Sequence, residues 1–266
     1  MKSVVKMMVG AVLLTAFGTV AAQEPPTALN SAADWNKNAN VTDVDGVINV
    51  KKNNVILLSK KFDIDPAKKY TLKFSCRAVN IEKDGDRSMI YAGFNVFDKT
   101  GRTINCYNCC TVPNTMTEVV EDAPKGAKVI KVKDASKFRK RFGTLNAGAK
   151  DDLSDLPNFN MLGFVKDFVQ KDDVWEVSLQ YPLRVPVKAG TAVREHLRGG
   201  YIYTAGIKSV GKDWITMSGT ITGMKNGTWT GSVWPFGAVK AQVVILVNWN
   251  NKKLETQFKD VSLTVE

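Results

Sequence analysis

Residues typical of catalytic sites are scarce in this chain. Its 266 residues include a single histidine, His196, within the segment 194–198. A Ser-His-Asp or Cys-His mechanism would have to use His196, because no other side chain with an ordinary pKa titrates near neutral pH. No Gly-x-Ser-x-Gly sequence accompanies it. We therefore expect His196 to have a structural hydrogen-bonding role, and we assign no catalytic residue.

Long apolar runs are also missing, with one exception at the N-terminus. Residues 1–6 are short and positive, residues 7–20 are apolar, and small residues at 20–22 precede the helix-breaking Gln23-Glu24-Pro25-Pro26. This is the three-part pattern of a secretory signal, and its apolar run is shorter than the roughly 20 residues that span a bilayer. We expect cleavage near Ala22 and a secreted or periplasmic protein with no transmembrane segment. The alternative is a buried N-terminal helix.

Cysteine is rare as well, and the residues present are Cys76, Cys106, Cys109 and Cys110. Cys106 and Cys109 have the spacing of half a zinc site, but the second Cys or His pair that such sites need is missing. Disulfides persist in the oxidising compartments that exported proteins reach. We therefore expect disulfides among these residues, with free buried thiols and a metal site as alternatives. The sequence does not choose among the possible pairings.

The charge of the chain is basic and unevenly distributed. Loss of Lys2 and Lys6 with the signal lowers the net charge from +11 to +9. Residues 125–142 hold many cations and one acid, Asp134. Such a stretch attracts acidic polymers or anionic surfaces, although a solvated basic surface is the alternative; export argues against nucleic acid as the partner. The candidate basic patch consists of Lys137, Arg139, Lys140 and Arg141.

Helical periodicity is nearly absent after residue 22, whereas period-two alternation is frequent. Within Lys69–Arg77, every second residue from Tyr70 to Cys76 is apolar, as in a half-buried strand. Short strands separated by Gly- and Asn-rich turns predict an all-β sandwich. Further strands are expected at 88–98, 201–207, 214–223, 241–249 and 258–265.

A stretch in the middle of the chain differs from its flanks. Residues 125–138 and 174–194 predict short strands on either side of an Asp-rich, Pro-containing loop at 149–160. We therefore expect a small β subdomain inserted into the sandwich. The expected organisation is a signal peptide at 1–22, a sandwich made of 23–114 and 201–266, and an inserted β subdomain at 115–200.

Four segments of the flanks carry a family resemblance. Residues 62–78 include the run Tyr-Thr-Leu-Lys-Phe, 91–102 join a strand to a turn, 214–223 alternate again, and 258–263 read Phe-Lys-Asp-Val-Ser-Leu. In this order they resemble jelly-roll carbohydrate-binding modules of the galactose-binding-like type, such as families 4, 9 and 22. Lys259 replaces the first Asp of the family's closing strand. The resemblance covers roughly half of the chain after residue 22.

The resemblance implies a fold and a function. The fold would be all-β, a jelly-roll β-sandwich interrupted by the small inserted β subdomain. The function would be non-catalytic binding of an extracellular or cell-surface polysaccharide, with an anionic polymer as one option. The insert resembles small β units of phage-tail and exported surface proteins, which modules of these families lack. The resemblance therefore does not place the glycan site.

Aromatic side chains are the best candidates for sugar binding. An exposed ring stacks on the apolar face of a pyranose, while polar side chains satisfy its hydroxyls. The Gly-rich loop 226–237 holds two Trp and one Phe, which serve either as a stacking platform or as a core plug. The candidate ligand-binding residues are Trp229, Trp234 and Phe236 in this loop and Tyr91, Tyr201, Tyr203 and Trp249 on the strands.

A structural calcium ion is the one cofactor that we consider. Modules of the resembled type often hold one, and Asp43, Asp45 and Asp260 are the candidate ligands, with ordinary turn residues as the alternative; Asp43-Val-Asp45-Gly46 lacks the spacing of an EF-hand loop. Two other functions stay open. One is a structural or adhesive surface protein, and the other is a polysaccharide-degrading enzyme that uses two carboxylates.

Overall fold

The computed structural model describes residues 22–52, 55–139, 141–227, 231–251 and 253–266. Almost all of the expected signal peptide, Lys140 of the basic patch and Trp229 of the aromatic loop therefore lie outside the described residues. Within these ranges, no helix is long and apolar enough to cross a membrane.

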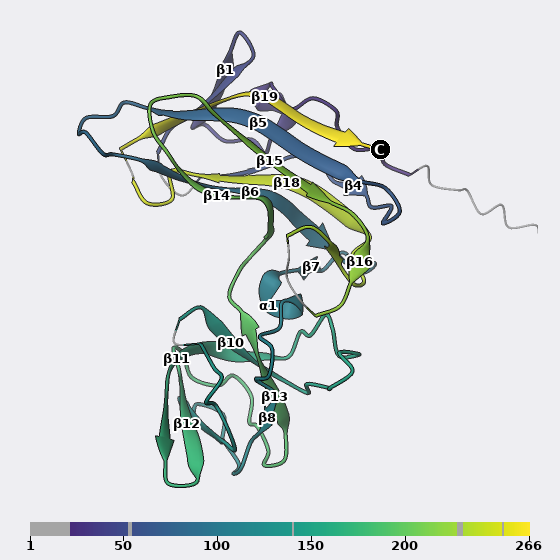
Figure 1. Ribbon diagram of the computed structural model, residues 1–266, viewed down its shortest axis with the longest axis vertical. Coiled ribbons are helices and arrows are strands. Elements are labelled where there is room, and N and C mark those ends of the chain that lie inside the picture. The colour runs from purple at the N-terminus through teal and green to yellow at the C-terminus, as the bar shows by residue number, and fades with distance from the viewer. Residues whose placement is uncertain (1–21, 53–54, 140, 228–230, 252) are drawn as a thin grey trace, which may run out of the picture.

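Two antiparallel sheets stack face to face in the larger part of the molecule (Figure 1). Sheet A consists, in spatial order, of β1 (Val41–Val44), β2 (Val47–Val50), β19 (Glu255–Val265), β5 (Tyr70–Val79) and β15 (Ile215–Ile221). Sheet B consists of β14 (Ile202–Val210), β6 (Ser88–Phe97), β18 (Lys240–Val247) and β3 (Val55–Leu58), with β4 (Phe62–Asp63) beside β18 and β7 (Thr103–Ile104) beside β6. Every sheet-A and sheet-B strand thus comes from before residue 105 or after residue 201.

The core of this sandwich follows from the alternation of its strands. Tyr70, Leu72 and Phe74 of β5 are buried, whereas the residues between them are partly or fully exposed, which confirms the strand predicted there. Trp234 is 0% exposed and packs against Tyr70 and Phe94, with ring centroids 5.4 and 5.0 Å away. The prediction that Trp234 binds ligand is therefore wrong. Its large apolar area is buried in the core.

A second, smaller β unit is connected to the sandwich on the side of sheet B (Figure 1). Its strands, in spatial order, are β8 (Thr117–Glu118), β13 (Ala192–Leu197), β10 (Gly143–Ala147), β11 (Met161–Lys171), β12 (Val174–Leu179) and β9 (Val129–Val132). The bridge between Val119 and Val132 joins the first strand to the last and closes the sheet into a barrel. Its core includes Ile130, Leu145 and Val193. The fold class is confirmed: an all-β sandwich interrupted by a small β insert.

Short elements connect these units. The chain leaves the sandwich through β7 and α1 (Cys106–Cys109) and returns to it through residues 198–201. A 3-10 helix, η1 (Ala32–Asp34), precedes β1. The short strand β16 (Met224–Lys225) pairs in parallel with β17 (Trp234–Pro235), which holds Trp234. Both passages between sandwich and barrel therefore run close to α1.

The four cysteines form no disulfide, so the disulfide prediction is wrong. All four thiols are free and buried. The Sγ atoms of Cys109 and Cys110 are 3.7 Å apart, well beyond the roughly 2.05 Å of a disulfide bond. Burial raises the pKa of Cys76 to about 12 and also raises that of Cys110. These cysteines act as small apolar core residues.

Candidate functional site

A continuous group of aromatic rings lies on the outer face of sheet B, the face turned away from sheet A. Ring centroids are 6.3 Å apart for Tyr201 and Tyr203, 5.3 Å for Tyr203 and Tyr91, and 6.4 Å for Tyr91 and Trp249. We call these residues the aromatic row. Trp249 is 39% exposed, and the tyrosines are partly exposed. The sequence predicted all four as ligand residues, and the fold brings them together.

Strand alternation places the row outside the core. In β6, Ile90 and Ala92 point into the sandwich, so Tyr91 between them points outward. In β14, buried Ile202 lies opposite Phe94, and Tyr203 follows on the outer side. A bulge interrupts the pairing of β14 with β6 between Ile202 and Gly206 and brings the backbone at Tyr203 close to β6.

Gly93 makes this close approach possible. A Cβ atom at Gly93 would lie 1.9 Å from the carbonyl oxygen of Ile202 and 2.8 Å from the Cα atom of Tyr203. No side chain fits that space without moving β14. Gly93 is therefore a positioning residue for Tyr203, and the sequence analysis missed it because an isolated glycine in a strand does not say which neighbour approaches it.

A chain of amides crosses the same face beside the row. The Nε2 atom of Gln242 donates to the carbonyl of Ser59 at 2.9 Å, which leaves its Oε1 atom to accept from Nδ2 of Asn95 at 3.3 Å. The Oδ1 atom of Asn95 is buried and has no hydrogen-bond partner. The Ser59 carbonyl thus fixes both amide orientations. The chain of amides therefore ends in a buried acceptor that has no partner among the described residues.

The polar atoms of the row are also free. Within the part of the chain that the structure describes, the hydroxyls of Tyr91, Tyr201 and Tyr203 and the indole N–H of Trp249 have no hydrogen-bond partner. Burial raises the pKa of Tyr203, and burial together with the neighbouring Tyr107 raises that of Tyr201. These phenols are therefore neutral at physiological pH, able both to donate and to accept.

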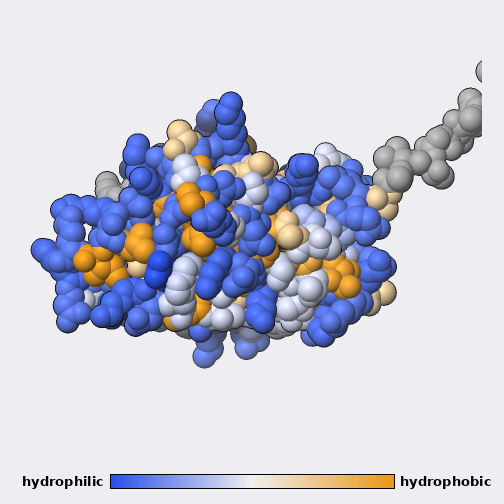
Figure 2. All heavy atoms as spheres, turned by 90° about the horizontal axis from the view of Figure 1, so that it is seen from above, coloured by the Kyte–Doolittle hydropathy of each residue, from blue (hydrophilic) through white to orange (hydrophobic). Residues whose placement is uncertain are grey.

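The outer face of sheet A differs from that of sheet B. Figure 2 looks down on this side of the molecule, which is predominantly hydrophilic. Its side chains bond to one another: the hydroxyls of Thr71 and Thr220 are 3.0 Å apart, and Arg77 donates to Gln257 at 2.7 Å. The indole of Trp214 on this face is flanked by Arg77 and Lys259, each 4.7 Å from the ring centroid. Aromatic groups with free polar atoms thus distinguish sheet B.

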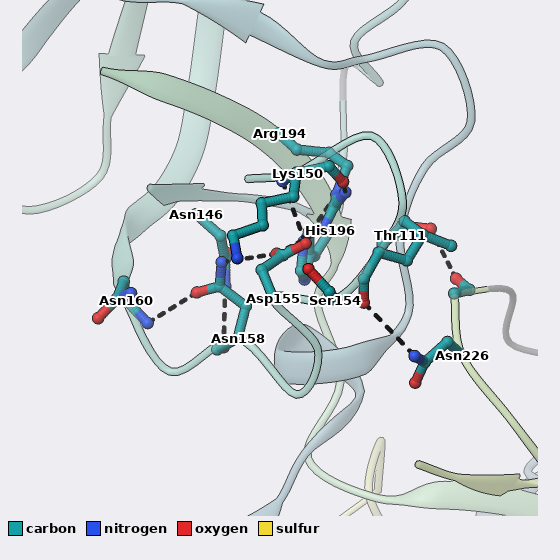
Figure 3. A network of polar contacts seen from close by, with 12 residues as sticks. Thr111, Asn146, Lys150, Ser154, Asp155, Asn158, Asn160, Arg194, His196 and Asn226 are labelled. Atoms are coloured by element: carbon teal, nitrogen blue, oxygen red, sulfur yellow. Dashed lines mark hydrogen bonds and ion pairs between the residues drawn. The ribbon is translucent and has the colours of Figure 1, made fainter. Parts of the chain in front are cut away.

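A polar network joins the barrel to α1 (Figure 3). His196 Nδ1 lies 3.0 Å from the carbonyl of Tyr107, and its Nε2 accepts from Nε of Arg194 at 3.3 Å. Asn146 donates to the same Tyr107 carbonyl at 3.1 Å. Burial lowers the pKa of His196 to about 4, and the adjacent Arg194 adds to this effect. His196 is thus a neutral structural residue, consistent with the role expected for it.

The same network contains a buried ion pair. Arg194 Nη2 and Asp155 Oδ2 are 2.6 Å apart, and each side chain is 5% exposed. Burial would raise the pKa of Asp155, but hydrogen bonds from Asn158 and Arg194 outweigh it and the pKa is lowered. This pair holds the loop 149–160 against β13. In the same loop, Asn158 receives a hydrogen bond from Asn108 of α1 at 3.0 Å.

One buried carboxyl group lies inside the barrel. Glu195 is 0% exposed and accepts the backbone N–H of Arg139 at 2.9 Å. Burial raises its pKa to about 7. A Cβ atom at Gly143 would lie 1.9 Å from Glu195 Oε1, so the carboxyl group fills the space that this glycine leaves open. It supports the 139–142 segment rather than facing the aromatic row.

Other predicted ligand residues lie away from the row. Phe236 is 56% exposed but stacks on no ring of the row among the residues described. Trp229 and Lys140 lie outside the described ranges. Lys137, Arg139 and Arg141 are exposed at the surface of the barrel and form no ion pair within the described chain. The basic patch is therefore separate from the row in the fold.

The predicted calcium ligands do not form a cluster of carboxylates among the described residues. Asp43 accepts the backbone N–H of Ala32 at 2.7 Å, Asp45 has a φ of 51° in the turn between β1 and β2, and Asp260 has a φ of 55° at the bulge of β19. No group of three or more His, Cys, Asp or Glu within the described ranges could hold a metal ion. These aspartates have turn and bulge roles, and calcium binding stays a prediction.

Residues that the sequence analysis did not find include Asn95, Gln242 and Tyr107. The only available signal was strand periodicity, which places Asn95 on the same face as Tyr91 but does not say that the face is free. Comparison with known proteins adds no further assignment, because no family model, no curated protein and no solved structure matches this chain.

Proposed function

We propose that this protein is a non-catalytic polysaccharide-binding protein and that the aromatic row on sheet B is its binding surface. The observation that carries the proposal is the combination of neighbouring aromatic rings, in tilted and edge-to-face pairs, with unpaired polar atoms on one sheet face. Pyranose rings present apolar C–H faces and a fringe of hydroxyls. Tyr91, Tyr203 and Trp249 would contact the ring faces, and the free tyrosine hydroxyls would exchange hydrogen bonds with the sugar hydroxyls.

The geometry suits an extended ligand better than a small enclosed one. The four rings follow one another at centroid distances of 5.3 to 6.4 Å, so successive units of a chain could contact successive rings. Each aromatic contact contributes about 0.5–1.5 kcal/mol beyond the burial of area. Several such contacts give useful affinity without a deep pocket.

Export and charge fit the same proposal. The signal expected at 1–22 would deliver the protein to a compartment where polysaccharides occur and nucleic acid is not an expected partner. Arg139 and Arg141 on the barrel would add a long-range attraction to anionic chains, which salt screens within about 8–10 Å. No step of the proposal requires a metal or another cofactor.

The test is affinity electrophoresis of residues 23–266 in native gels that contain glucan, xylan, mannan, galactan or polygalacturonan. We expect at least one polymer to retard the wild-type protein. The double variant Tyr91→Ala/Tyr203→Ala should lose about ten-fold or more in affinity, because two aromatic contacts are removed. Trp214→Ala is the matched control, since this indole lies on the outer face of sheet A and should leave retention unchanged.

Three results would contradict the proposal. Retention of the double variant like the wild type, with unchanged thermal unfolding, would exclude the row. Self-association without polymer and no retardation by any polymer would favour the structural or adhesive alternative. New reducing ends or unsaturated products during the incubation would show a polysaccharide-degrading enzyme.

A further inference from the structure

The barrel presents a defined face to the sandwich, and strand register shows which residues lie on it. Thr144 pairs with His196 on one side and with Phe164 on the other. Directly paired residues project from the same side of a sheet. Val193 lies in the barrel core, so the alternation of β13 turns His196 outward. Phe164, Thr144 and His196 therefore share the outer face.

Arg198 extends this face by one more position. Its backbone N–H donates to the carbonyl of Phe142 at 2.7 Å, which continues the β10–β13 ladder beyond Leu197 and gives Arg198 the same outward direction as His196. The guanidinium carbon lies 4.2 Å from the centroid of the Phe164 ring. Arg198 is exposed and forms no ion pair within the described chain.

The same barrel face meets the end of the aromatic row at α1. His196 and Asn146 both bond to the carbonyl of Tyr107. The backbone N–H of Tyr107 in turn donates to the carbonyl of Gly199 at 3.4 Å, next to Arg198. Tyr107 is also close enough to Tyr201 to raise its pKa.

Chain length limits the distance between Arg198 and the row. Tyr201 is three positions after Arg198, so their Cα atoms are at most about 11 Å apart even if the chain is fully extended. This is within reach of two adjacent long side chains that bind one polymer. The Tyr201 end of the row therefore lies within about 11 Å, from Cα to Cα, of a cation that forms no ion pair among the described residues.

We propose that Arg198 is an anion subsite at the Tyr201 end of the aromatic row and that the ligand is a polysaccharide with an anionic substituent on its sugars. This inference rests on the proposed function and names its substrate class. The insert would then complete the binding surface of the sandwich.

The chemistry of Arg198 supports this assignment over the basic patch. Stacking on Phe164 holds the guanidinium plane while its N–H edge stays free to donate to a carboxylate or sulfate. Lys137, Arg139 and Arg141 are exposed without such a platform, so they would attract anions without orienting them. Arg198 would thus determine specificity, whereas the patch would raise the association rate.

The test uses matched polymers that differ in charge on the same backbone. The probes are polygalacturonan with its methyl-esterified form, glucuronoxylan with unsubstituted xylan, and a sulfated galactan with unsulfated galactan. The wild type should bind the charged member of at least one pair about ten-fold more tightly. Arg198→Gln should abolish this preference and retain binding to the neutral member. Arg139→Gln/Arg141→Gln, the matched control, should keep the preference at 0.5 M salt.

The outcomes separate this inference from the proposed function. Equal binding of charged and neutral members by the wild type, or an unchanged preference in Arg198→Gln, would overturn the anion subsite and leave the aromatic row intact. Loss of the preference only in the Arg139/Arg141 variant would assign it to the basic patch instead. Absence of binding to both members of every pair would overturn both proposals. The polymer pair for which the wild type prefers the charged member shows whether the bound group is a carboxylate or a sulfate.

Discussion

Glu195 and His196 are adjacent in β13, and burial shifts their pKa values in opposite directions. The pKa of Glu195 rises from 4.5 to about 7, and that of His196 falls from 6.5 to about 4. Between pH 4.5 and 7 the unfolded state has already lost the Glu195 proton that the folded state keeps, so the free energy of unfolding falls as the pH rises. Between pH 4 and 6.5 the unfolded state binds a proton at His196 that the folded state rejects, so the free energy of unfolding rises with pH.

The two slopes oppose each other in the wild type, and single variants should separate them. Glu195→Gln should retain only the His196 contribution, so the free energy of unfolding should rise from pH 4 to 6.5. At pH 8 it should exceed that of the wild type by on the order of 1–2 kcal/mol. His196→Asn should leave the Glu195 contribution, so stability should fall from pH 4.5 to 7. Urea unfolding across this pH range measures both slopes.

Charged groups face both residues of this pair, and a distant carboxylate serves as the control for the experiment. Arg139 faces Glu195, while Arg194 and Asp155 face His196. Asp63→Asn, a change at a distant carboxylate whose pKa the side chain of Lys240 lowers, should lower stability by a constant amount above the ordinary Asp pKa and leave the slopes between pH 4.5 and 7 as in the wild type. Parallel pH profiles of wild type, Glu195→Gln and His196→Asn would contradict the opposed shifts.

At the scale of elements, the contact between β6 and β14 determines whether the row exists. A Cβ atom at position 93 would lie 2.6 Å from the backbone nitrogen of Thr204 as well as against Ile202 and Tyr203. Gly93→Ala must therefore displace β14. We expect destabilisation of about 1–3 kcal/mol, as in other overpacked sites, together with loss of polymer binding because Tyr203 moves.

Gly200→Ala provides the matched control for this change. Gly200 lies just before β14, a Cβ atom there would meet nothing within 4 Å, and its φ is not in the left-handed region. The unfolding midpoint and the polymer affinity of the Gly200→Ala variant should equal those of the wild type. The measurements are urea unfolding and affinity electrophoresis. Wild-type binding by Gly93→Ala would show that β14 tolerates the displacement and that Tyr203 is not positioned in this way.

At the scale of the whole molecule, α1 fixes the barrel relative to the sandwich. Asn146 donates from the barrel to Tyr107, and Asn108 donates from α1 to Asn158. Asn108→Ala/Asn146→Ala removes these two side-chain links and keeps that of His196 to the Tyr107 carbonyl. We expect a loss of about 2–4 kcal/mol, because the buried carbonyl of Asn158 loses the side-chain donors Asn108 and Asn146. We also expect faster amide exchange in α1 and in residues 198–201.

Binding should distinguish this variant from a merely destabilised protein. If the barrel supplies Arg198 to the row, loosening α1 should reduce the preference for charged polymers while neutral polymers still bind. Asn49→Ala is the control, because Asn49 bonds only on the outer face of sheet A. Hydrogen exchange with mass spectrometry locates the effect. Unchanged exchange at 198–201 would show that other contacts hold the barrel.

Periodicity in the sequence was enough to predict the fold class and the strand at Tyr70–Val79. Alternating residues must bury one face, and that requirement is local. The four residues Tyr91, Tyr201, Tyr203 and Trp249 were likewise found by residue type, because aromatic side chains on strands are few. The predictions that Trp234 binds ligand and that the cysteines form disulfides were wrong, because burial and sulfur distances depend on which distant segments meet.

The sequence alone determined the alternation of the strands, the position of the insert and the basic character of the chain, since each depends on neighbouring residues or on composition. Only the tertiary structure decided that Tyr91 and Tyr203 share a free face, that Asn95 lacks a partner and that Arg198 lies over the Phe164 ring. Those relations depend on strand register, on the space left at Gly93 and on the contacts of α1. They join residues far apart in sequence, and no local pattern encodes such contacts.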